Sequence, residues 1–402
     1  MFSILKFIAA KPRTKDKTIF QMKSEQRSKI SLVSYHNEYN YGTMLQAYAL
    51  WRVIHDMGFD SEYISFNQGK PNKIYGKVKT AFKLFFTDFG KFYSTLFHVT
   101  QDEFWKCKEF ASIKSEFDIF YNTNIPHTSI IYDPESFDKI STLYSKFIIG
   151  SDQTWSPYRY SKKNPFFLSF VRNHKLKNSY APSIGTSNFP DNLKPVYKQE
   201  LETFENLSCR ENTGCRILET IVKKKVHHVI DPTLLLNVEK WNELAVPSVV
   251  KQKYILCYLL GTKKCIWNFA EELGRQNNIP VYYIVTSQTY LKHQNRLLGI
   301  GPGQFIGLIK DAEYICTDSY HGTLFSINYR KNFYSFMKRD GDIDRIDNSR
   351  IYDVLEELSL INRFKNDGDL SFEQDIDYSV VYPIIKNLRE KSTQYLKMIL
   401  DS

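Results

Sequence analysis

The residue types most suggestive of chemistry lie in a short polar stretch, 317–323, which reads Thr-Asp-Ser-Tyr-His-Gly-Thr. It follows an apolar stretch and precedes a helix-like one, so it predicts a strand, a tight turn and the first turn of a helix. Such a turn offers backbone N–H groups and the positive end of a helix dipole to an anion. His321 lies in this turn, and histidine ordinarily titrates nearest neutral pH. The stretch predicts acid–base chemistry on a phosphorylated substrate; a purely structural histidine is the alternative.

Arg210 is the second candidate, because it follows the short apolar stretch 207–209. A guanidinium at the end of a strand can hold a carboxylate or a phosphate through paired hydrogen bonds. Arg210 and His321 both fall in the second half of the chain, so we expect them to share one anionic ligand. The alternative for Arg210 is an ion pair with Glu211. Three further cations follow the last predicted strand and would add positive charge at the same edge: Lys338, Arg339 and Arg350.

Other residues that could do chemistry have simpler interpretations. Asp152 and Asp231 follow predicted strands, and we expect both to cap a helix or a turn rather than act as bases. The adjacent His227 and His228 have no further ligands at a suitable spacing, and the six cysteines form no C-x-x-C pair. No G-x-G-x-x-G sequence is present, so a dinucleotide site is not indicated. We therefore expect neither a metal nor a resident cofactor.

The elements that position these residues alternate between strands and helices, which predicts parallel α/β layers. Residues 30–34 predict a strand and 43–57 a helix with its apolar residues close to one face. Gly58 is expected to end this helix, because glycine favours the left-handed cap position. Further strands are predicted over 62–64, 146–149, 179–181, 207–209, 228–230, 254–260, 281–285, 313–316 and 333–337, and further helices over 194–206, 302–311 and 379–400.

Two α/β halves are expected to face each other, with a ligand in the cleft at the carboxyl ends of their strands. The first half is predicted over 30–206 and the second over 207–375, and the C-terminal helix, 376–402, is expected to pack back on the first half. The cleft is expected to include the following strand-end residues of the first half: Asn40, Gly42, Asp152, Gln153 and Ser183.

Residues 74–121 interrupt this alternation and predict a helical insertion in the first half. Phenylalanine recurs there at helical spacing, which favours a buried stripe. The alternative is a surface for a sugar or a lipid-linked substrate.

Residues 1–29 form a basic leader with eight Lys and Arg against two acidic residues, in a chain of net charge +10. We expect a disordered leader that precedes a true start at Met22; the alternative is a contact with an anionic membrane surface. No stretch is long and apolar enough to span a bilayer, and no convincing secretory signal is present. The cysteine pattern fits a reducing cytoplasm. Nucleic-acid binding is not expected, because the lysines are scattered rather than set among stacking aromatics.

Six short stretches, taken in order, resemble the polysaccharide pyruvyl transferase family. The resemblance implies a glycosyltransferase-B-like fold of two Rossmann-like halves, with phosphoenolpyruvate as donor substrate and a sugar of a cell-surface polysaccharide as acceptor. The product would be a pyruvate ketal on two hydroxyls of that sugar. The stretches are 40–50, 149–155, 179–185, 209–211, 230–235 and 317–323, and by their order and spacing the resemblance covers roughly residues 30–400.

By this resemblance, Arg210 and His321 match positions that bind or activate the donor. Some members carry an arginine two residues before this histidine, where this chain has Ser319, so a second cation for the donor would come from Lys338, Arg339 or Arg350. The other residues expected to bind the donor are Ser319, Gly322 and Thr323. The first-half cleft residues named above are expected to bind the acceptor, for which a lipid-linked oligosaccharide is one candidate.

Two other functions fit the same pattern. A glycosyltransferase that uses a nucleotide sugar would also need a strand-end cleft and a cationic grip on phosphate. A non-catalytic scaffold of a polysaccharide assembly complex would dock through residues 74–121. Binding of phosphoenolpyruvate, of a nucleoside diphosphate, or of neither distinguishes the three functions.

Overall fold

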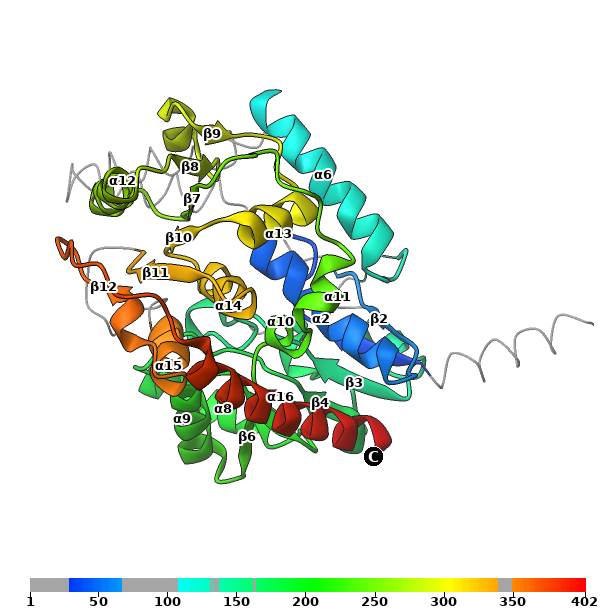
Figure 1. The fold of residues 1–402 in the computed structure, drawn as a ribbon. Helices are drawn as coiled ribbons and strands as arrows, with labels where there is room; N and C mark the ends of the chain where they lie inside the picture. The colour runs from blue at the N-terminus through cyan, green and yellow to red at the C-terminus, as the bar shows by residue number, and fades with distance from the viewer. Residues whose placement is uncertain (1–28, 67–107, 131, 133–136, 162–163, 339–348) are drawn as a thin grey trace, which may run out of the picture.

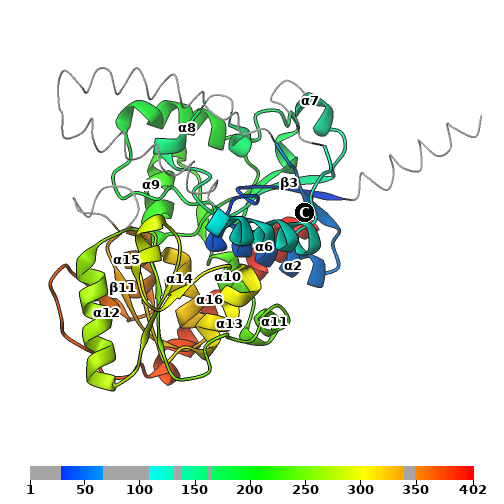
Figure 2. The ribbon, with the colours of Figure 1, turned by 90° about the horizontal axis from the view of Figure 1, so that it is seen from above.

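The structure, a computed structural model, describes residues 29–66, 108–130, 132, 137–161, 164–338 and 349–402. Its longest sheets belong to two α/β bodies that lie side by side (Figures 1 and 2). All their strand pairs are parallel, and helices connect successive strands. The fold is therefore two Rossmann-like halves in a glycosyltransferase-B-like arrangement, as the sequence predicts.

The first half is built on a four-stranded sheet in the order β2 (Ser61–Tyr63), β1 (Ile30–Val33), β3 (Lys146–Ile149) and β4 (Lys177–Ser179). β1 and β3 are buried along their whole length. Strands covered on both faces are mostly apolar, and the runs Ile-Ser-Leu-Val and Lys-Phe-Ile-Ile made these two visible in the sequence.

Two more strands, β5 (Leu207–Cys209) and β6 (Val226–His228), continue from the edge of this sheet. The backbone N–H of Ser179 donates to the carbonyl of Asn206 over 3.1 Å. The hydroxyl of Ser208 donates to the carbonyl of Ser179 over 2.7 Å, and the hydroxyl of Ser179 accepts from the N–H of Ser208. β5 and β6 therefore belong to the first half.

The boundary between the halves differs from the predicted one at residues 206 and 207. The chain passes to the second sheet only after His228, so Arg210 stands at the end of a strand of the first half. A strand pattern identifies a strand but not its neighbour in the sheet, which is why β5 was assigned to the wrong half.

The second half carries a six-stranded sheet in the order β12 (Phe364–Lys365), β11 (Asn332–Phe336), β10 (Tyr314–Thr317), β7 (Ile255–Tyr258), β8 (Val281–Ile284) and β9 (Arg296–Leu297). The helices of this half are α12 (Lys264–Asn277), α13 (Pro302–Asp311), α14 (Tyr320–Asn328) and α15 (Ser349–Glu357). In the first half, α2 (Tyr41–Asp56) ends before Gly58, whose φ of 88° lies in the left-handed region. Besides α6 and α16, which are described below, the remaining α-helices of the described residues are α7 (Phe137–Ile140), α8 (Lys194–Leu201), α9 (Asn212–Val222), α10 (Pro232–Leu235) and α11 (Val238–Asn242).

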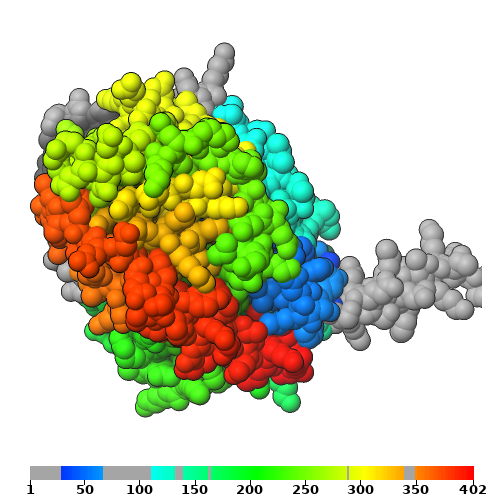
Figure 3. All heavy atoms as spheres, viewed as in Figure 1, coloured from blue at the N-terminus to red at the C-terminus, as the bar shows by residue number. Residues whose placement is uncertain are grey.

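The C-terminal helix α16 (Tyr378–Asp401) returns from the second half to the first and lies on the surface across both (Figures 1 and 3). The buried ammonium of Lys146 donates to the carbonyls of Ile399 and Leu400, at the negative end of the helix dipole. The hydroxyl of Tyr395 donates to the carbonyl of Ser179 over 3.0 Å. α16 thus packs on the first half.

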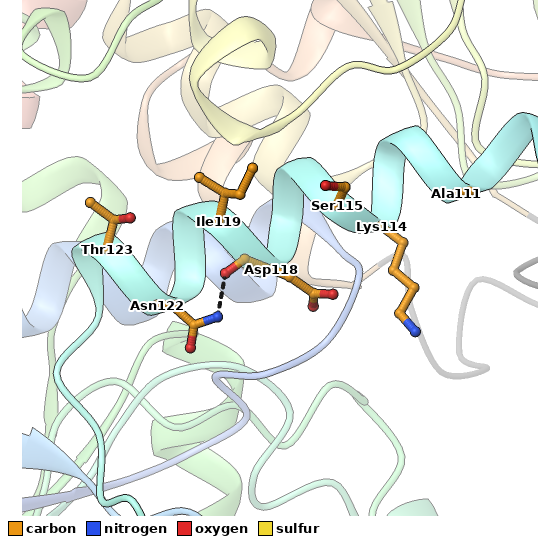
Figure 4. A pocket seen from close by; sticks show the side chains of 7 residues that line it. All are labelled: Ala111, Lys114, Ser115, Asp118, Ile119, Asn122 and Thr123. Atoms are coloured by element: carbon orange, nitrogen blue, oxygen red, sulfur yellow. Dashed lines mark hydrogen bonds between the residues drawn. The ribbon is translucent and has the colours of Figure 1, made fainter.

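Of the predicted insertion, the structure describes only the last part, within α6 (Lys108–Asn124); residues 74–107 lie outside the described ranges. Phe110, Phe117 and Phe120 of α6 are buried, so this part is a buried stripe. The opposite face is polar, and there the side-chain amide of Asn122 donates to the backbone carbonyl of Asp118 over 2.8 Å (Figure 4). The leader lies outside the described ranges except for its last residue, Lys29.

Candidate functional site

Asp231 stands where the two halves meet, and one of its carboxylate oxygens contacts three groups. Oδ2 accepts from Nη1 of Arg210 over 2.8 Å and from the hydroxyl of Ser151 over 3.0 Å, and it lies 3.5 Å from Nε2 of His321. Oδ1 accepts from the N–H and the hydroxyl of Thr233, so Asp231 is also the N-cap of α10. The capping role expected from the sequence is present, but it uses only one of the two oxygens.

Arg210 reaches this carboxylate from the end of β5, with its side chain fully buried. Nε donates to Glu211 over 2.9 Å, so the ion pair considered as an alternative exists as well. The guanidinium carbon lies 4.3 Å from the centre of the Tyr320 ring, a cation–π contact. Among the described residues, Nη2 of Arg210 has no hydrogen-bond partner. A buried cationic N–H left unpaired is costly, and a ligand that accepts from it removes that cost.

His321 enters from the second half, in the first turn of α14, and is only 7 % exposed. Its ring packs directly on the first turn of α2, because a Cβ added at Gly42 would lie 2.1 Å from Nδ1 of His321. Only glycine leaves room for the imidazole at this position. Gly42 therefore lies beside the group around Asp231, where its lack of a side chain allows the close approach of His321.

Asp152 follows β3 and holds a left-handed backbone, with a φ of 76° that is unusual for a residue other than glycine. Its Oδ2 accepts from the hydroxyl of Thr43 over 2.8 Å, and its Oδ1 from the N–H of Gln153. Thr43 is in the first turn of α2, whose N-cap, Asn40, accepts from the Thr43 N–H. Strained backbone held by such contacts is typical of functional sites.

Charge determines the protonation of the two carboxyls. Burial alone would raise the pKa of Asp231, but His321 and Arg210 lower it well below its ordinary value. Burial would likewise raise the pKa of Asp152, but Arg210, His321, Arg159 and Arg350 lower it. Both carboxyls are therefore ionised at neutral pH. The pKa of Arg210 moves the other way: burial would lower it, but Tyr320, Glu211 and Asp231 raise it.

Ser319, Gly322 and Thr323, the other predicted donor residues, lie at the start of α14 and bond or pack within the second half. Ser319 is the N-cap of α14, and its hydroxyl accepts from the N–H of Gly322 over 3.3 Å. Gly322 packs on Thr317, where a Cβ would lie 2.3 Å from the hydroxyl oxygen. The fully buried Thr323 bonds through its hydroxyl to the carbonyl of Ser319 and to Ser335. Thr323 differs from the prediction, since it stabilises the start of α14 rather than presenting a group to a ligand.

Of the three cations proposed to replace the absent arginine, Arg350 lines the same cavity as Arg210 and Asp231. Its guanidinium carbon is 5.5 Å from the centre of the Tyr320 ring, the same ring that Arg210 contacts. Lys338 follows β11, and its carbonyl lies against Gly261 at the end of β7. Arg339 lies outside the described residues.

Two further predicted cleft residues stand beside the turn after β3. Gln153 is buried, and its amide lies against Gly185, whose φ is 64°. Ser183 follows β4; its carbonyl accepts from the N–H of Trp155, and its buried hydroxyl has no hydrogen-bond partner among the described residues.

Sequence reasoning did not identify Ser151, Tyr320 and Arg159 as parts of this site. Ser151 and Tyr320 are next to residues that were identified, so their position in the strand-end turns was the available signal. Arg159 comes from a one-turn helix, Pro157–Arg159, and its guanidinium carbon lies 5.4 Å from the centre of the Tyr35 ring. No strand precedes it directly, so the strand-end rule could not have found it.

A narrow cavity separates Arg210 from Arg350 and is also lined by Asp231, Tyr320 and Asp353. It offers about 10 Å³ to water-sized molecules, close to the room that one water needs. Within the described ranges, no group of three or more His, Cys, Asp or Glu side chains is arranged to hold a metal ion. In the same ranges every helix is too short or too polar to cross a membrane.

Comparison with known sequences identifies the class of protein. The family model described as polysaccharide pyruvyl transferase matches residues 40–337. Because this match covers most of the chain, the protein belongs to the polysaccharide pyruvyl transferase family, as its motifs indicated. The match spans every described element that contributes to the group around Asp231. No curated protein sequence shows a significant match.

Among solved structures, the chain is similar to several UDP-GlcNAc 2-epimerases. With the enzyme from Methanocaldococcus jannaschii it shares 11% identity at a TM-score of 0.48, covering 93% of this chain and 92% of the other. With the enzyme from Neisseria meningitidis bound to UDP-GlcNAc it shares 11% identity at a TM-score of 0.45, covering 92% and 99%. With the enzyme from Rickettsia bellii it shares 11% identity at a TM-score of 0.41, covering 93% and 98%.

Proposed function

We propose that this protein transfers the enolpyruvyl-derived group of phosphoenolpyruvate to two hydroxyls of one sugar, forming a pyruvate ketal. The sugar belongs to a cell-surface polysaccharide or its precursor, in keeping with the family. One observation carries the choice of donor: Nη2 of the buried Arg210 has no hydrogen-bond partner among the described residues. The Nη1 of the same guanidinium binds the carboxylate of Asp231, which also contacts His321. This pairs a cationic anchor with an acid–base group.

The donor is a small dianionic or trianionic molecule, and its site should be rich in fixed positive charge. Arg210 and Arg350 both lie against the Tyr320 ring, and the first turn of α14 adds the positive end of a helix dipole. In our proposal Nη2 of Arg210 and the guanidinium of Arg350 bind the donor's phosphate and carboxylate. Arg350 thus takes the place of the arginine that some family members carry where this chain has Ser319.

The reaction needs one proton delivered to carbon. In the proposed sequence His321 gives its proton to the methylene carbon of the donor, which becomes a methyl group, and the adjacent carbon becomes cationic. A sugar hydroxyl attacks this carbon and loses its proton, which restores the histidine. The carbon–oxygen bond to phosphate then breaks, a second hydroxyl attacks, and its proton leaves with the phosphate. Asp231 stabilises the protonated imidazole and fixes its orientation.

In our proposal the acceptor binds against residues of the first half. Asp152 is ionised at neutral pH and can accept a hydrogen bond from a sugar hydroxyl. The buried hydroxyl of Ser183 also lies on this half and supports the same placement. We assign Asn40, Gly42 and Gln153 to the same acceptor side. We propose a cytoplasmic location, which the free thiols of the described cysteines support.

Binding and turnover of two variants test the proposal. Phosphoenolpyruvate binding is measured by calorimetry, and phosphate release from it is followed with a panel of aryl hexosides as acceptors. Arg210→Ala should abolish detectable donor binding, whereas His321→Gln should bind the donor nearly normally and lose about 10²- to 10⁴-fold in turnover. His55→Gln, at an exposed position of α2, is the matched control.

Calorimetry with UDP and GDP beside phosphoenolpyruvate distinguishes the competing functions. Binding of UDP or GDP without binding of phosphoenolpyruvate would indicate a glycosyltransferase. Binding of neither would favour a scaffold. Normal turnover by a folded His321→Gln variant would remove His321 from the mechanism.

A further inference from the structure

The helix that follows Arg210 is capped by a residue from the other half. α9 begins two residues after Arg210, and its own N-cap, Glu211, makes no side-chain capping bond. Instead the N–H of Thr213 donates to Oδ2 of Asp353 over 3.0 Å, and the hydroxyl of Thr213 donates to Oδ1 over 2.9 Å. Asp353 belongs to α15 in the second half. A carboxylate at a helix N-terminus satisfies an N–H and favours the helix dipole.

A second carboxylate on α15 extends this contact by one turn. Oε1 of Glu357 accepts from the side-chain amide of Asn212 over 3.2 Å and lies 3.5 Å from Nδ1 of His228. Asn212 and His228 both belong to the first half, at the start of α9 and the end of β6. α15 and α9 are neighbours in both ribbon views (Figures 1 and 2). Asp353 and Glu357 therefore join the two halves beside Arg210.

The same helix carries Arg350. Residues 350, 353 and 357 are three and four positions apart, so they share one face of α15. While Asp353 holds α15 on α9, Arg350 lies against the Tyr320 ring that Arg210 also contacts. The docking of α15 therefore sets the separation of the two guanidiniums.

We propose that Asp353 is a positioning residue for the donor site. It caps α9 across the cleft and thereby fixes both the turn that carries Arg210 and the helix that carries Arg350. This inference rests on the proposed function, in which these two arginines bind phosphoenolpyruvate. The cavity between them has room for about one water. A donor is larger than this cavity, so the two arginines must move apart for it to bind between them.

The test compares Asp353→Ala and Asp353→Asn with Glu356→Gln, which alters an exposed carboxylate on the same helix. Phosphoenolpyruvate binding is measured by calorimetry. Hydrogen exchange by mass spectrometry is measured without ligand on peptides covering residues 211–216. Asp353→Ala should bind the donor about five- to thirtyfold more weakly, as the loss of a charged cap predicts, and should exchange faster at the start of α9. Asp353→Asn keeps an acceptor oxygen and should restore part of both properties, and Glu356→Gln should resemble the wild type.

The two readouts separate the cap from the proposed function. An unchanged exchange rate in Asp353→Ala would show that the cap does not hold α9, and would overturn the inference. Faster exchange with unchanged donor binding would leave the cap but overturn its positioning role. A wild-type protein that does not bind phosphoenolpyruvate would refute the proposed donor, whatever the exchange measurement shows. If Asp353→Ala does not fold, Thr213→Val removes one of the two bonds and should show a smaller effect in the same direction.

Discussion

Replacement of Asp231 by asparagine should destabilise the protein strongly. The carboxylate and the Arg210 side chain are both fully buried, and they are joined by a 2.8 Å bond. Asparagine keeps the size and can still cap α10 through one oxygen, but it removes the negative charge that Arg210 and His321 face. Breaking a buried ion pair by removing one partner costs about 3–5 kcal/mol. We expect a loss in unfolding free energy near the lower end of this range, because Glu211 still pairs with Arg210.

The loss should depend on pH in a definite direction. The pKa of Asp231 is lowered in the folded protein, since His321 and Arg210 outweigh the effect of burial. Its charge therefore stabilises the fold above the ordinary carboxyl pKa of about 4, and this stabilisation declines as the pH falls below that value. Urea unfolding followed by tryptophan fluorescence should show a large difference between wild type and Asp231→Asn at pH 7, and a smaller one at pH 3.5.

Asp60→Asn is the control, because this carboxylate is 72% exposed and lies 3.8 Å from Lys29. It should unfold nearly as the wild type does. A loss below about 1 kcal/mol for Asp231→Asn at pH 7, the scale of a surface pair, would refute the assignment of a buried carboxylate shared by Arg210 and His321. A loss of equal size at both pH values would refute the electrostatic origin.

Three other perturbations have expected outcomes. Gly42→Ala places a Cβ 2.1 Å from Nδ1 of His321, so phosphate release should fall at least tenfold while circular dichroism stays unchanged. Normal release would show that the close approach of His321 to Gly42 is not needed for turnover. Burial lowers the pKa of His36 to about 4, so stability should fall as the pH drops from 6.5 to 4, and His36→Phe should flatten this slope in urea unfolding. Removal of residues 399–402 takes away the carbonyls that Lys146 contacts. The buried, unpaired ammonium should lower the free energy of unfolding by about 2–4 kcal/mol in the same urea assay. An unchanged urea midpoint would show that the end of α16 does not stabilise Lys146.

The sequence predicted the fold well where burial leaves a pattern. The fully buried β1 and β3 are mostly apolar, and α2 ends before Gly58, as the sequence indicated. The strand-end rule likewise placed Arg210 and His321 at the edges of sheets. These features are local, so a single chain segment contains the information that determines them.

Pairing between segments could not be predicted in the same way. β5 has the pattern of any short buried strand, and its place beside β4 depends on hydroxyl bonds between Ser179 and Ser208, which no periodicity encodes. The second role of Asp231 was missed for a similar reason. Its capping of α10 is local and visible in Asp231-Pro232, whereas its contacts with Arg210 and His321 link residues 21 and 90 positions away.

The corrected boundary changes the nature of the site. If both Arg210 and His321 belonged to the second half, that half alone could bind and activate a donor. In the structure they come from opposite halves, and Asp231 stands on the connection between the two sheets and contacts both. His321 also packs on Gly42 of the first half, and Asp353 of the second half caps α9 of the first. His321 is therefore packed on a residue of the first half, and Arg210 lies against Tyr320 of the second. The arrangement that the proposed chemistry needs is therefore complete only where the two halves meet.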